Sequence, residues 1–455
     1  MSPRTSTDAV KPYGVDGSPP MERTQVLAGD VPITVYGLGK IGLPVAAVLA
    51  ERTGAVTGVD IDRSVVARVA DGQPPFDHEP ELAALLSDVV PDRLATTADV
   101  EAAASEAAVH VIVVPVPIDD GQADLAALRD VTTAIGGGLA PGDLVVVEST
   151  VPPGTVDEVV GPLLAKTSAL ERSAFGVASC PERTSSGRAV SDVRGSYPRI
   201  VGGTDAGATA AAETFYDAVI ETSVRPVADA RTAEAVKLFE GVYRDVNIAL
   251  ANELARAFDD TPIDVRDAID AANTLPFCDI HEPGVGVGGH CIPWYPYFLM
   301  QAAAGPTPLT ATGRTVNDAM PRLVADRTLE ALRRRGIEPE ECHVAVLGYA
   351  YRPGIPEAAA TPAAPLKRRL EEAGVEVSIV DPVLERHGHE VELLGMDELA
   401  TAAPDAVILV TAHEAFEELE YGALGEPLVI DGRDAVPPGV ARTYTVGRGW
   451  HREDQ

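Results

Sequence analysis

Short apolar runs alternate with helical patterns along the first third of the chain. The strand-like runs are 33–36, 55–59, 109–114, 144–147 and 174–178. A glycine turn at 37–42 and an apolar helical stretch at 43–51 follow the first run, and alanine-rich helical stretches separate the others. Strands that alternate with helices predict a parallel sheet that is covered by helices on both faces.

The middle of the chain lacks strand-like runs. Apolar residues recur every three or four positions across 231–260, which predicts one long helix. Helical patterns continue at 268–272 and from about 296 to 335. We therefore expect a helical central domain with a long spine helix, which is suited to carry a homodimer interface.

The strand–helix order returns near the C-terminus. A run at 343–348, a helical stretch at 363–373 and a run at 376–380 that ends at Asp381 repeat the order of 31–60. The glycine turn of this second copy reads GYAYRPG and lacks the GxGxxG spacing, so we expect it to bind a different ligand or none.

The predicted fold is α/β, with two Rossmann-like parallel-sheet domains joined by the helical domain. The expected parts are a flexible tail at 1–28, a first Rossmann domain at 29–205, the central domain at 206–325 and a second Rossmann-like domain at 326–455.

Composition narrows the class of protein. The 455 residues are 45% hydrophobic and 23% charged, which fits a soluble globular protein, and no apolar run is long enough to cross a bilayer. We expect a cytoplasmic protein without a membrane partner. The four cysteines have no CxxC spacing, so we expect reduced thiols rather than disulfides or a metal site.

The chain is strongly acidic. Its net charge is −33, and only five of its 36 basic residues are lysines. This balance is consistent with a high-salt cytoplasm, where screening weakens self-repulsion; an ordinary acidic bacterial protein is the alternative. Either protein repels nucleic acid, so helix N-termini and a few placed cations must hold any phosphate ligand.

A glycine-rich turn carries the first functional signal. Gly37, Gly39 and Gly42 have the GxGxxG spacing between a strand and a helix, and Asp60 follows the next strand. In dinucleotide sites such glycines allow a tight turn, close approach to a pyrophosphate and helix–strand packing, while the acid binds the ribose hydroxyls. Asp60 would repel a 2′-phosphate, so the pattern favours NAD over NADP; a tight turn without a cofactor is the alternative.

A cysteine follows a second glycine-rich segment, PGVGVGGHCIP at 283–293. Cys291 is thereby placed on backbone that can approach a ligand closely, and a helix that begins near Pro296 would favour a thiolate. Such a thiolate could attack a carbonyl. A buried cysteine beside a flexible loop explains the pattern equally well.

Three other positions are candidates, each with a structural alternative. Lys237 is one of few lysines, but it could pair with Glu234 or Glu240 on a solvated helix face. Glu182 follows a strand end, where catalytic groups of open α/β sheets are found, or it forms a surface ion pair. Ser149 or Thr150, in a second strand-end segment, could lie against the cofactor; the alternative is that this segment is only a proline-rich turn.

These segments together resemble the UDP-glucose/GDP-mannose dehydrogenase family over about residues 31–447. The matching segments are VYGLGKIGLP (35–44), VDID (59–62), ESTVPPGT (148–155), CPER (180–183), YPRIVGG (197–203), KLFEGVYRDVNIALANEL (237–254), GVGVGGHCIP (284–293), GRTVND (313–318), VAVLGYAYRPG (344–354) and IDGRD (430–434). The segments RDVNIALANE and VGGHCIP are most similar in sequence to the UDP-N-acetylmannosamine dehydrogenase branch.

The resemblance implies a four-electron oxidation of a UDP-sugar C6 alcohol to a uronate, with two NAD⁺ per sugar. Cys291 would hold the aldehyde as a thiohemiacetal and then as a thioester, Lys237 would stabilise an oxyanion, and Glu182 would direct water. Further residues implied to bind NAD are Lys40, Ile41 and Val116, and those implied to bind substrate are Arg199, Arg244, Asn247, Arg352 and Arg433.

The sequence departs from the family pattern at several positions of this site. Four residues after the cysteine, the family has an Asp and this chain has Tyr295. Four residues after the lysine, the family has an Asn and this chain has Gly241. In a turn at a strand end, this chain has Val116 where the family has a Thr. Before the glycine loop, the family has a segment that contains an Arg, whereas residues 275–277 of this chain are Leu-Pro-Phe. A second Arg of the family is absent from residues 356–361.

Two interpretations follow. In the first, the enzyme is active and Tyr295 or Glu240 takes the missing role, with UDP-N-acetyl-D-mannosamine, UDP-glucose or UDP-N-acetylglucosamine as the substrate. In the second, the chain is a nucleotide-sugar-binding paralogue with impaired turnover. The retained Cys291, Lys237, Glu182 and Asp60 favour the first.

Overall fold

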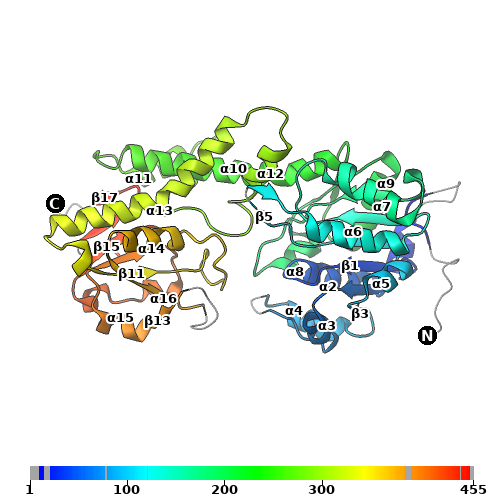
Figure 1. Cartoon of the computed structure of the whole chain (residues 1–455), viewed down its shortest axis with the longest axis horizontal. Helices are drawn as coiled ribbons and strands as arrows, with labels where there is room; N and C mark the ends of the chain where they lie inside the picture. Colours follow the sequence, from blue (N-terminus) through cyan, green and yellow to red (C-terminus); the bar gives the residue numbers. More distant parts are fainter. Residues whose placement is uncertain are drawn as a thin grey trace. The chain divides into compact units, whose positions relative to one another are not determined.

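The structure is a computed structural model that describes residues 10–14, 21–76, 79–119, 121–384, 391–440 and 442–450. The contacts divide the chain into two compact units. Unit 1 comprises Met1–Phe239 and Tyr297–Ala304, and unit 2 comprises Glu240–Pro296 and Gly305–Gln455. Each unit is built around its own sheet (Figure 1).

The sheet of unit 1 has eight strands in the order β10-β9-β8-β7-β4-β1-β2-β3. They are β1 (Ile33–Tyr36), β2 (Val56–Val59), β3 (Leu94–Thr97), β4 (Val109–Ile112), β7 (Leu144–Val147), β8 (Gly176–Ser179), β9 (Arg199–Gly203) and β10 (Val224–Pro226). Neighbouring strands are parallel except for β8 and β9. β1, β4 and β7 are buried at every position, because a parallel sheet covered on both faces leaves no solvent side.

Helices cover both faces of this sheet. They are α1 (Arg23–Leu27), α2 (Gly42–Thr53), α3 (Arg63–Ala70), α4 (Leu82–Val89), α5 (Val100–Glu106), α6 (Ala126–Gly138), α7 (Gly161–Ser168), α8 (Ala189–Ser191) and α9 (Ala206–Val219), with short turns η1 (Val156–Val160), η2 (Arg172–Ala174) and η3 (Asp192–Ser196). Side chains of α2, α4 and α9 fill the core on one face, and side chains of α5, α6 and α7 fill the core on the other. A small hairpin, β5 (Ile118–Asp119) and β6 (Gln122–Ala123), stands apart from the sheet.

Two expected boundaries differ from the structure. Helix α9 was expected to begin the central domain, but Phe215 and Tyr216 are buried in the core of unit 1. The expected tail is also partly folded, because α1 places Val26 in the same core and Lys11 Nζ donates to Asp143 Oδ1 at 2.9 Å. Apolar periodicity marks the face that a helix buries but not the sheet that it packs against.

The sheet of unit 2 has seven strands in the order β13-β12-β11-β14-β15-β16-β17. They are β11 (His343–Leu347), β12 (Glu376–Val380), β13 (Leu393–Leu394), β14 (Ala406–Leu409), β15 (Leu428–Asp431), β16 (Thr443–Thr445) and β17 (Gly449–Trp450). Only the last pair is antiparallel. One face is covered by α13 (Pro308–Arg334) and α14 (Ala363–Glu372), and the other by α15 (Met396–Ala402), α16 (Glu414–Glu417) and η5 (Tyr421–Leu424).

The remaining helices are α10 (Ala230–Ala257), α11 (Val265–Ala272), α12 (Tyr295–Ala302) and the short turn η4 (Pro339–Glu341). The predicted spine is α10, and the division between the units falls within it, after Phe239. The prediction of two Rossmann-like sheets with a helical segment between them is confirmed. None of the helices in the described ranges combines the length and the hydropathy that a bilayer crossing needs.

Candidate active site

Five predicted site residues lie at the same edge of the sheet in unit 1. Gly37 follows β1, Asp60 follows β2, Val116 follows β4, Thr150 follows β7 and Glu182 follows β8. These strands are mutually parallel, so their carboxyl ends meet at one edge. Ligands of open α/β sheets bind outside this edge.

The glycine turn has two packed positions and one open position. Gly37 has a φ of 96°, and a Cβ there would lie 2.2 Å from the carbonyl oxygen of Val113. A Cβ on Gly42 would lie 1.9 Å from the carbonyl oxygen of Gly37. A Cβ on Gly39 would meet no atom within 4 Å. Gly37 and Gly42 are therefore fixed by the fold, whereas Gly39 faces space that a ligand can approach.

The turn fits a dinucleotide. Ile41, at the N-cap of α2, provides no side-chain hydrogen bond. The amide of Leu43 donates to the carbonyl of Gly39 at 3.0 Å and Pro44 has no N–H, so Gly42 offers the helix-start amide for a phosphate group. Asp60 accepts hydrogen bonds from the amides of Leu38 (2.8 Å) and Asp62 (2.9 Å), and it is only half-buried. A carboxylate has about four acceptor sites, so Asp60 keeps capacity for ribose hydroxyls. Lys40 is exposed beside the turn.

Buried hydrogen bonds hold the loops around this edge. Ser149 Oγ accepts from the amide of Val114 and donates to its carbonyl, both at 2.8 Å, which ties the loop after β7 to the loop after β4. Glu234 of α10 accepts from the amides of Gly154 (2.6 Å) and Val156 (2.8 Å). From the sequence, Glu234 is indicated only as an ion-pair partner of Lys237. In the structure, Glu182 is the residue that pairs with Lys237.

Lys237 and Glu182 form an ion pair at the same edge. Nζ lies 3.3 Å from Oε1, and the two side chains are 11% and 9% exposed. Oε2 accepts from the amide (2.8 Å) and the hydroxyl (2.6 Å) of Thr184. Burial alone would raise the pKa of Glu182, but the Lys237 ammonium and the Thr184 donors bring it below its ordinary value. The pair therefore offers an ionised carboxylate next to an ammonium group.

Arg199 does not lie with these residues. Its guanidinium is buried against Glu148 (3.5 Å) and lies over the ring of Tyr216. The Tyr216 hydroxyl donates to the same glutamate at 2.5 Å. The charge of Arg199 is thus paired inside unit 1, and its binding of substrate stays a prediction. From the sequence alone, an Arg at the start of an apolar strand could bind substrate or form a buried ion pair, and nothing in the pattern distinguishes the two roles.

In unit 2, Cys291 is exposed at the end of the glycine-rich loop. The amides of Trp294 and Tyr295 both donate to its carbonyl at 3.0 Å, so Cys291 occupies the turn that opens α12. Gly289 donates to the carbonyl of Ala359 at 2.8 Å, which fixes the loop on the other side of the cysteine. Helix α12 begins at Tyr295, one residue before the expected start.

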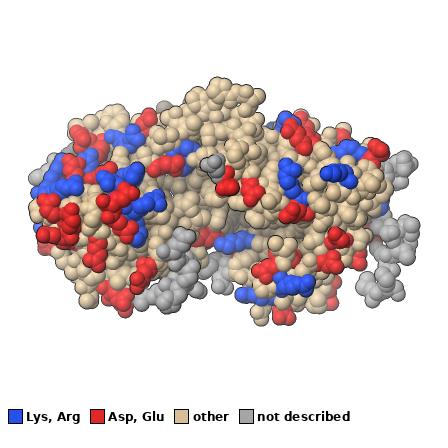
Figure 2. Space-filling model, in the orientation of Figure 1, with Lys and Arg blue, Asp and Glu red and all other residues tan. Residues whose placement is uncertain are grey.

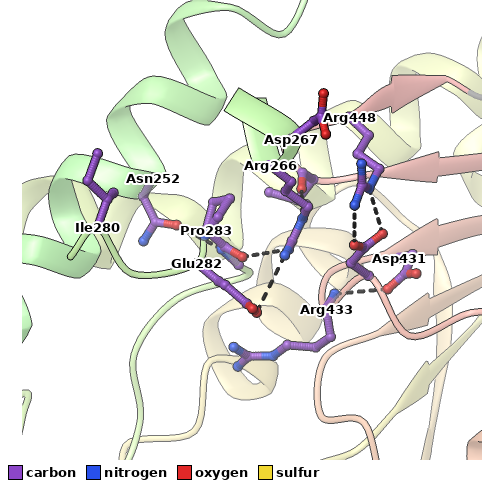
Figure 3. A network of polar contacts seen from close by, with 12 residues as sticks. Asn252, Arg266, Asp267, Ile280, Glu282, Pro283, Asp431, Arg433 and Arg448 are labelled. Atoms are coloured by element: carbon purple, nitrogen blue, oxygen red, sulfur yellow. Dashed lines mark hydrogen bonds and ion pairs between the residues drawn. The ribbon is translucent and has the colours of Figure 1, made fainter. Parts of the chain in front are cut away.

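Arg433 lies against the start of the same loop. A Cβ on Gly284 would lie 2.9 Å from Nη1 of Arg433, whose Nε donates to the carbonyl of Val410 at 2.7 Å. Arg266 of α11 is buried nearby and donates to the carbonyl of Pro283 at 2.7 Å (Figure 3). It also donates to the carbonyl of Val446 at 2.8 Å. Burial, and next the like charge of Arg266, lower the pKa of Arg433. Glu282 Oε2 lies 3.6 Å from Arg266 Nη1 and supplies one negative charge, so Arg433 is the guanidinium group here that favours an anionic ligand.

The other predicted substrate residues have different surroundings. Asn247 Nδ2 donates to the carbonyl of Asp279 at 2.6 Å, and its Oδ1 accepts from the amide of His281 at 2.9 Å. Its amide is thus used to hold the 279–281 segment. Arg244 is exposed on α10, and Arg352 is half-buried in the loop after β11.

Charged side chains of both signs are interspersed over the face seen in Figure 2. Among the described residues, no group of three or more His, Cys, Asp or Glu side chains has the arrangement of a metal site. None of the four cysteines, all of them in the described ranges, is in a disulfide, and Cys291 is the exposed one.

Three family domains match the chain in order. Residues 31–220 match the NAD binding domain of the UDP-glucose/GDP-mannose dehydrogenase family, residues 231–319 match its central domain, and residues 345–438 match its UDP binding domain. This confirms the predicted cofactor, NAD, and the prediction of a nucleotide-sugar dehydrogenase.

Curated relatives and solved structures cover nearly the whole chain. A UDP-N-acetyl-D-mannosamine dehydrogenase of Pyrococcus horikoshii is 34% identical over 92% of this chain and 99% of its own, and its solved structure has a TM-score of 0.85. An NDP-N-acetyl-D-galactosaminuronic acid dehydrogenase of Ralstonia nicotianae is 37% identical over 88% of this chain and 95% of its own. A solved structure of this second activity from Methanosarcina mazei is 28% identical, covers 95% and 99% of the two chains, and has a TM-score of 0.83. The chain belongs to the UDP-glucose/GDP-mannose dehydrogenase family.

Proposed function

We propose that this protein is an NAD-dependent 6-dehydrogenase of a UDP-linked 2-acetamido sugar, with UDP-N-acetyl-D-mannosamine as its substrate. The observation that carries the proposal is the Lys237–Glu182 ion pair at the sheet edge that also bears the glycine turn. The named relatives in both branches act on N-acetylated sugars, which supports the 2-acetamido class. UDP-N-acetyl-D-mannosamine is preferred because the P. horikoshii relative covers the larger share of the chain.

The glycine turn and the amide of Gly42 at the start of α2 would hold the pyrophosphate of NAD, and Asp60 its adenosine ribose. Lys40, Ile41, Val116 and Thr150 would line the same edge. Bound NAD⁺ supplies the hydride acceptor for each of two oxidations. Arg433 and Arg352 would bind the diphosphate of the sugar nucleotide, since guanidinium forks match phosphate oxygens.

Cys291 acts after the first oxidation. Its thiolate attacks C6 of the aldehyde, and the carbonyl oxygen takes up a proton to give a thiohemiacetal. Oxidation of this adduct leaves a thioester. Water then attacks the acyl carbon, the thiolate departs, and the uronate is released. The ammonium of Lys237 stabilises the oxyanion of each addition, and the ionised Glu182 accepts a proton from the attacking water.

The test is a substrate panel at molar salt. The purified protein is incubated with NAD⁺ and the UDP derivatives of N-acetylmannosamine, N-acetylglucosamine, N-acetylgalactosamine and glucose, and NADH absorbance is followed. We expect about two NADH per sugar with the first substrate, in keeping with a four-electron oxidation. Turnover of another sugar alone would refute the assignment at C2 or C4, and saturable binding without NADH would favour an impaired, sugar-nucleotide-binding paralogue.

Cys291→Ser separates the chemistry from binding. The variant is expected to bind the sugar nucleotide normally but to form no uronate, as measured by mass spectrometry of the product. Cys278→Ser is the matched control, because Cys278 is a half-buried thiol outside the glycine loop. Uronate formation by the Cys291 variant at the rate of the control would remove the thiol from the mechanism.

We further propose a homodimer through the central helices. Tyr243 and Leu250 of α10 are 54% and 46% exposed and lie seven residues apart, so they share one face of the helix. Leu275 and Phe277 add exposed apolar area after α11. Light scattering should give twice the chain mass, and Tyr243→Glu with Leu250→Glu should give the monomer; a monomeric parent protein would refute the proposal.

A further inference from the structure

Gly241 is the single glycine of α10, and the backbone conformation at this position does not explain why a glycine is present. Its φ is outside the left-handed region, and glycine destabilises a helix interior relative to alanine. The explanation lies in a neighbouring side chain. A Cβ on Gly241 would lie 2.2 Å from Cδ2, 3.1 Å from Cγ and 3.2 Å from Cβ of Tyr295. The ring of Tyr295 therefore rests directly on the backbone of α10.

Tyr295 links this contact to the cysteine turn. Its side chain is only 5% exposed, and its amide donates to the carbonyl of Cys291 at 3.0 Å. The loop before the cysteine contains four glycines, which have little conformational preference of their own. On that side the loop is held by the bond from Gly289 to Ala359 and by the contact of His290 Nε2 with Glu357 Oε2 at 3.4 Å. Tyr295 is the corresponding fixed point after the cysteine.

We propose that Tyr295 is a positioning residue, whose ring packs on Gly241 and thereby fixes the turn of Cys291 against α10. The contact acts through the ring, whose Cδ2 lies nearest to the backbone of Gly241. The inference rests on the proposed function, because Cys291 is the nucleophile there. A misplacement of about 1 Å can lower the rate of an oriented reaction about 100-fold, so a rigid anchor next to the thiol is needed.

The contact also joins two departures from the family pattern into one. An Asn at position 241 cannot coexist with the ring of Tyr295, because even its Cβ would overlap the ring. A Gly at 241 beside an Asp at 295 would leave the space of the ring empty. Gly241 and Tyr295 are thus a matched exchange, because the ring of Tyr295 needs a residue without a Cβ at position 241.

The experiment compares Gly241→Ala, Tyr295→Ala, Tyr295→Phe and the double variant Gly241→Ala/Tyr295→Ala. Hydrogen–deuterium exchange of peptides from 286–298 is measured in the ligand-free protein, and kcat/KM is measured where there is turnover. We expect Gly241→Ala and Tyr295→Ala each to speed local exchange and to lower kcat/KM by about 10-fold or more. The double variant should resemble Tyr295→Ala, and Tyr295→Phe should resemble the parent protein.

Gly313→Ala is the matched control. Gly313 also lies within a helix of unit 2, but its added Cβ would meet Val246 at 3.4 Å, an ordinary contact. We expect unchanged exchange at 286–298 in this variant. The proposal is overturned if Gly241→Ala behaves like Gly313→Ala, or if Tyr295→Phe is as impaired as Tyr295→Ala. The exchange data stand without turnover, so they separate failure of this inference from failure of the proposed function.

Discussion

Glu234 offers the sharpest quantitative test of the site in unit 1. It is 2% exposed, and its two oxygens accept hydrogen bonds from the amides of Gly154 and Val156. Burial raises its pKa to about 7; the two amides oppose this effect, Asp157 adds to it, and Arg231 opposes it. The perturbation is Glu234→Gln, which keeps the shape of the side chain but cannot ionise.

The magnitude follows from the two protonation states. A glutamate in the unfolded chain ionises near pH 4.5, whereas folded Glu234 holds its proton until about pH 7. Between these values the folded state binds more protons, so the free energy of unfolding falls as the pH rises. At about 1.4 kcal/mol per pH unit, the loss is about 3 kcal/mol by pH 8. Glutamine is not subject to this loss, although one of the two amides loses its acceptor.

The assay is urea unfolding, followed by far-UV circular dichroism, at pH 5, 6, 7 and 8. The two proteins should differ by roughly 1 kcal/mol or less at pH 5, and Glu234→Gln should gain on the parent by about 2–3 kcal/mol at pH 8. Glu158→Gln is the control, because Glu158 is exposed and pairs with Arg231 on the surface. Parallel curves for Glu234→Gln and the parent would refute the reasoning.

Other substitutions test the remaining features. Gly39→Ala should leave the free energy of unfolding unchanged but weaken NAD binding at least about 10-fold by calorimetry, because its Cβ faces open space that the cofactor would use. Gly42→Ala should lower the melting temperature even without NAD, since its Cβ would overlap the carbonyl of Gly37; equal melting temperatures for both variants would contradict this. Arg314→Leu leaves Asp245 buried without its cation and should destabilise by about 3–5 kcal/mol, whereas Arg314→Leu with Asp245→Leu should recover part of the loss; an undiminished loss in urea unfolding of the double variant would refute the pairing argument.

Spacing in the sequence was enough for the parts of the fold that depend on local backbone. The first strand and the glycine turn lie where expected, because Gly37 and Gly42 have no room for a side chain. The strand end that carries Glu182 was also predicted, although β8 begins two residues later than expected. Partners that are distant in sequence could not be predicted. Nothing in the sequence indicates that Arg199 forms a buried ion pair with Glu148 or that the ring of Tyr295 packs on Gly241.

The two aspartates that end the second strand of each sheet show why the repeated pattern does not repeat a function. Asp60 accepts two amides and is half-buried, so part of its carboxylate stays available beside the open turn. Asp381 accepts four amides, those of residues 349, 350, 383 and 384, and lies 3.3 Å from His413 Nε2. Burial alone would raise the pKa of Asp381, but His413 and the amides lower it.

A carboxylate has about four acceptor sites, and the protein itself fills them at Asp381. Ribose hydroxyls would therefore find an acceptor at the end of β2 but not at the end of β12. The loss of the GxGxxG spacing in the second copy agrees with this, because the loop after β11 turns inward to make two of these bonds. Saturated acceptors at Asp381, rather than a changed fold, thus leave ribose hydroxyls without an acceptor at the end of β12, and we propose that the second sheet binds its ligand through cationic side chains such as Arg433.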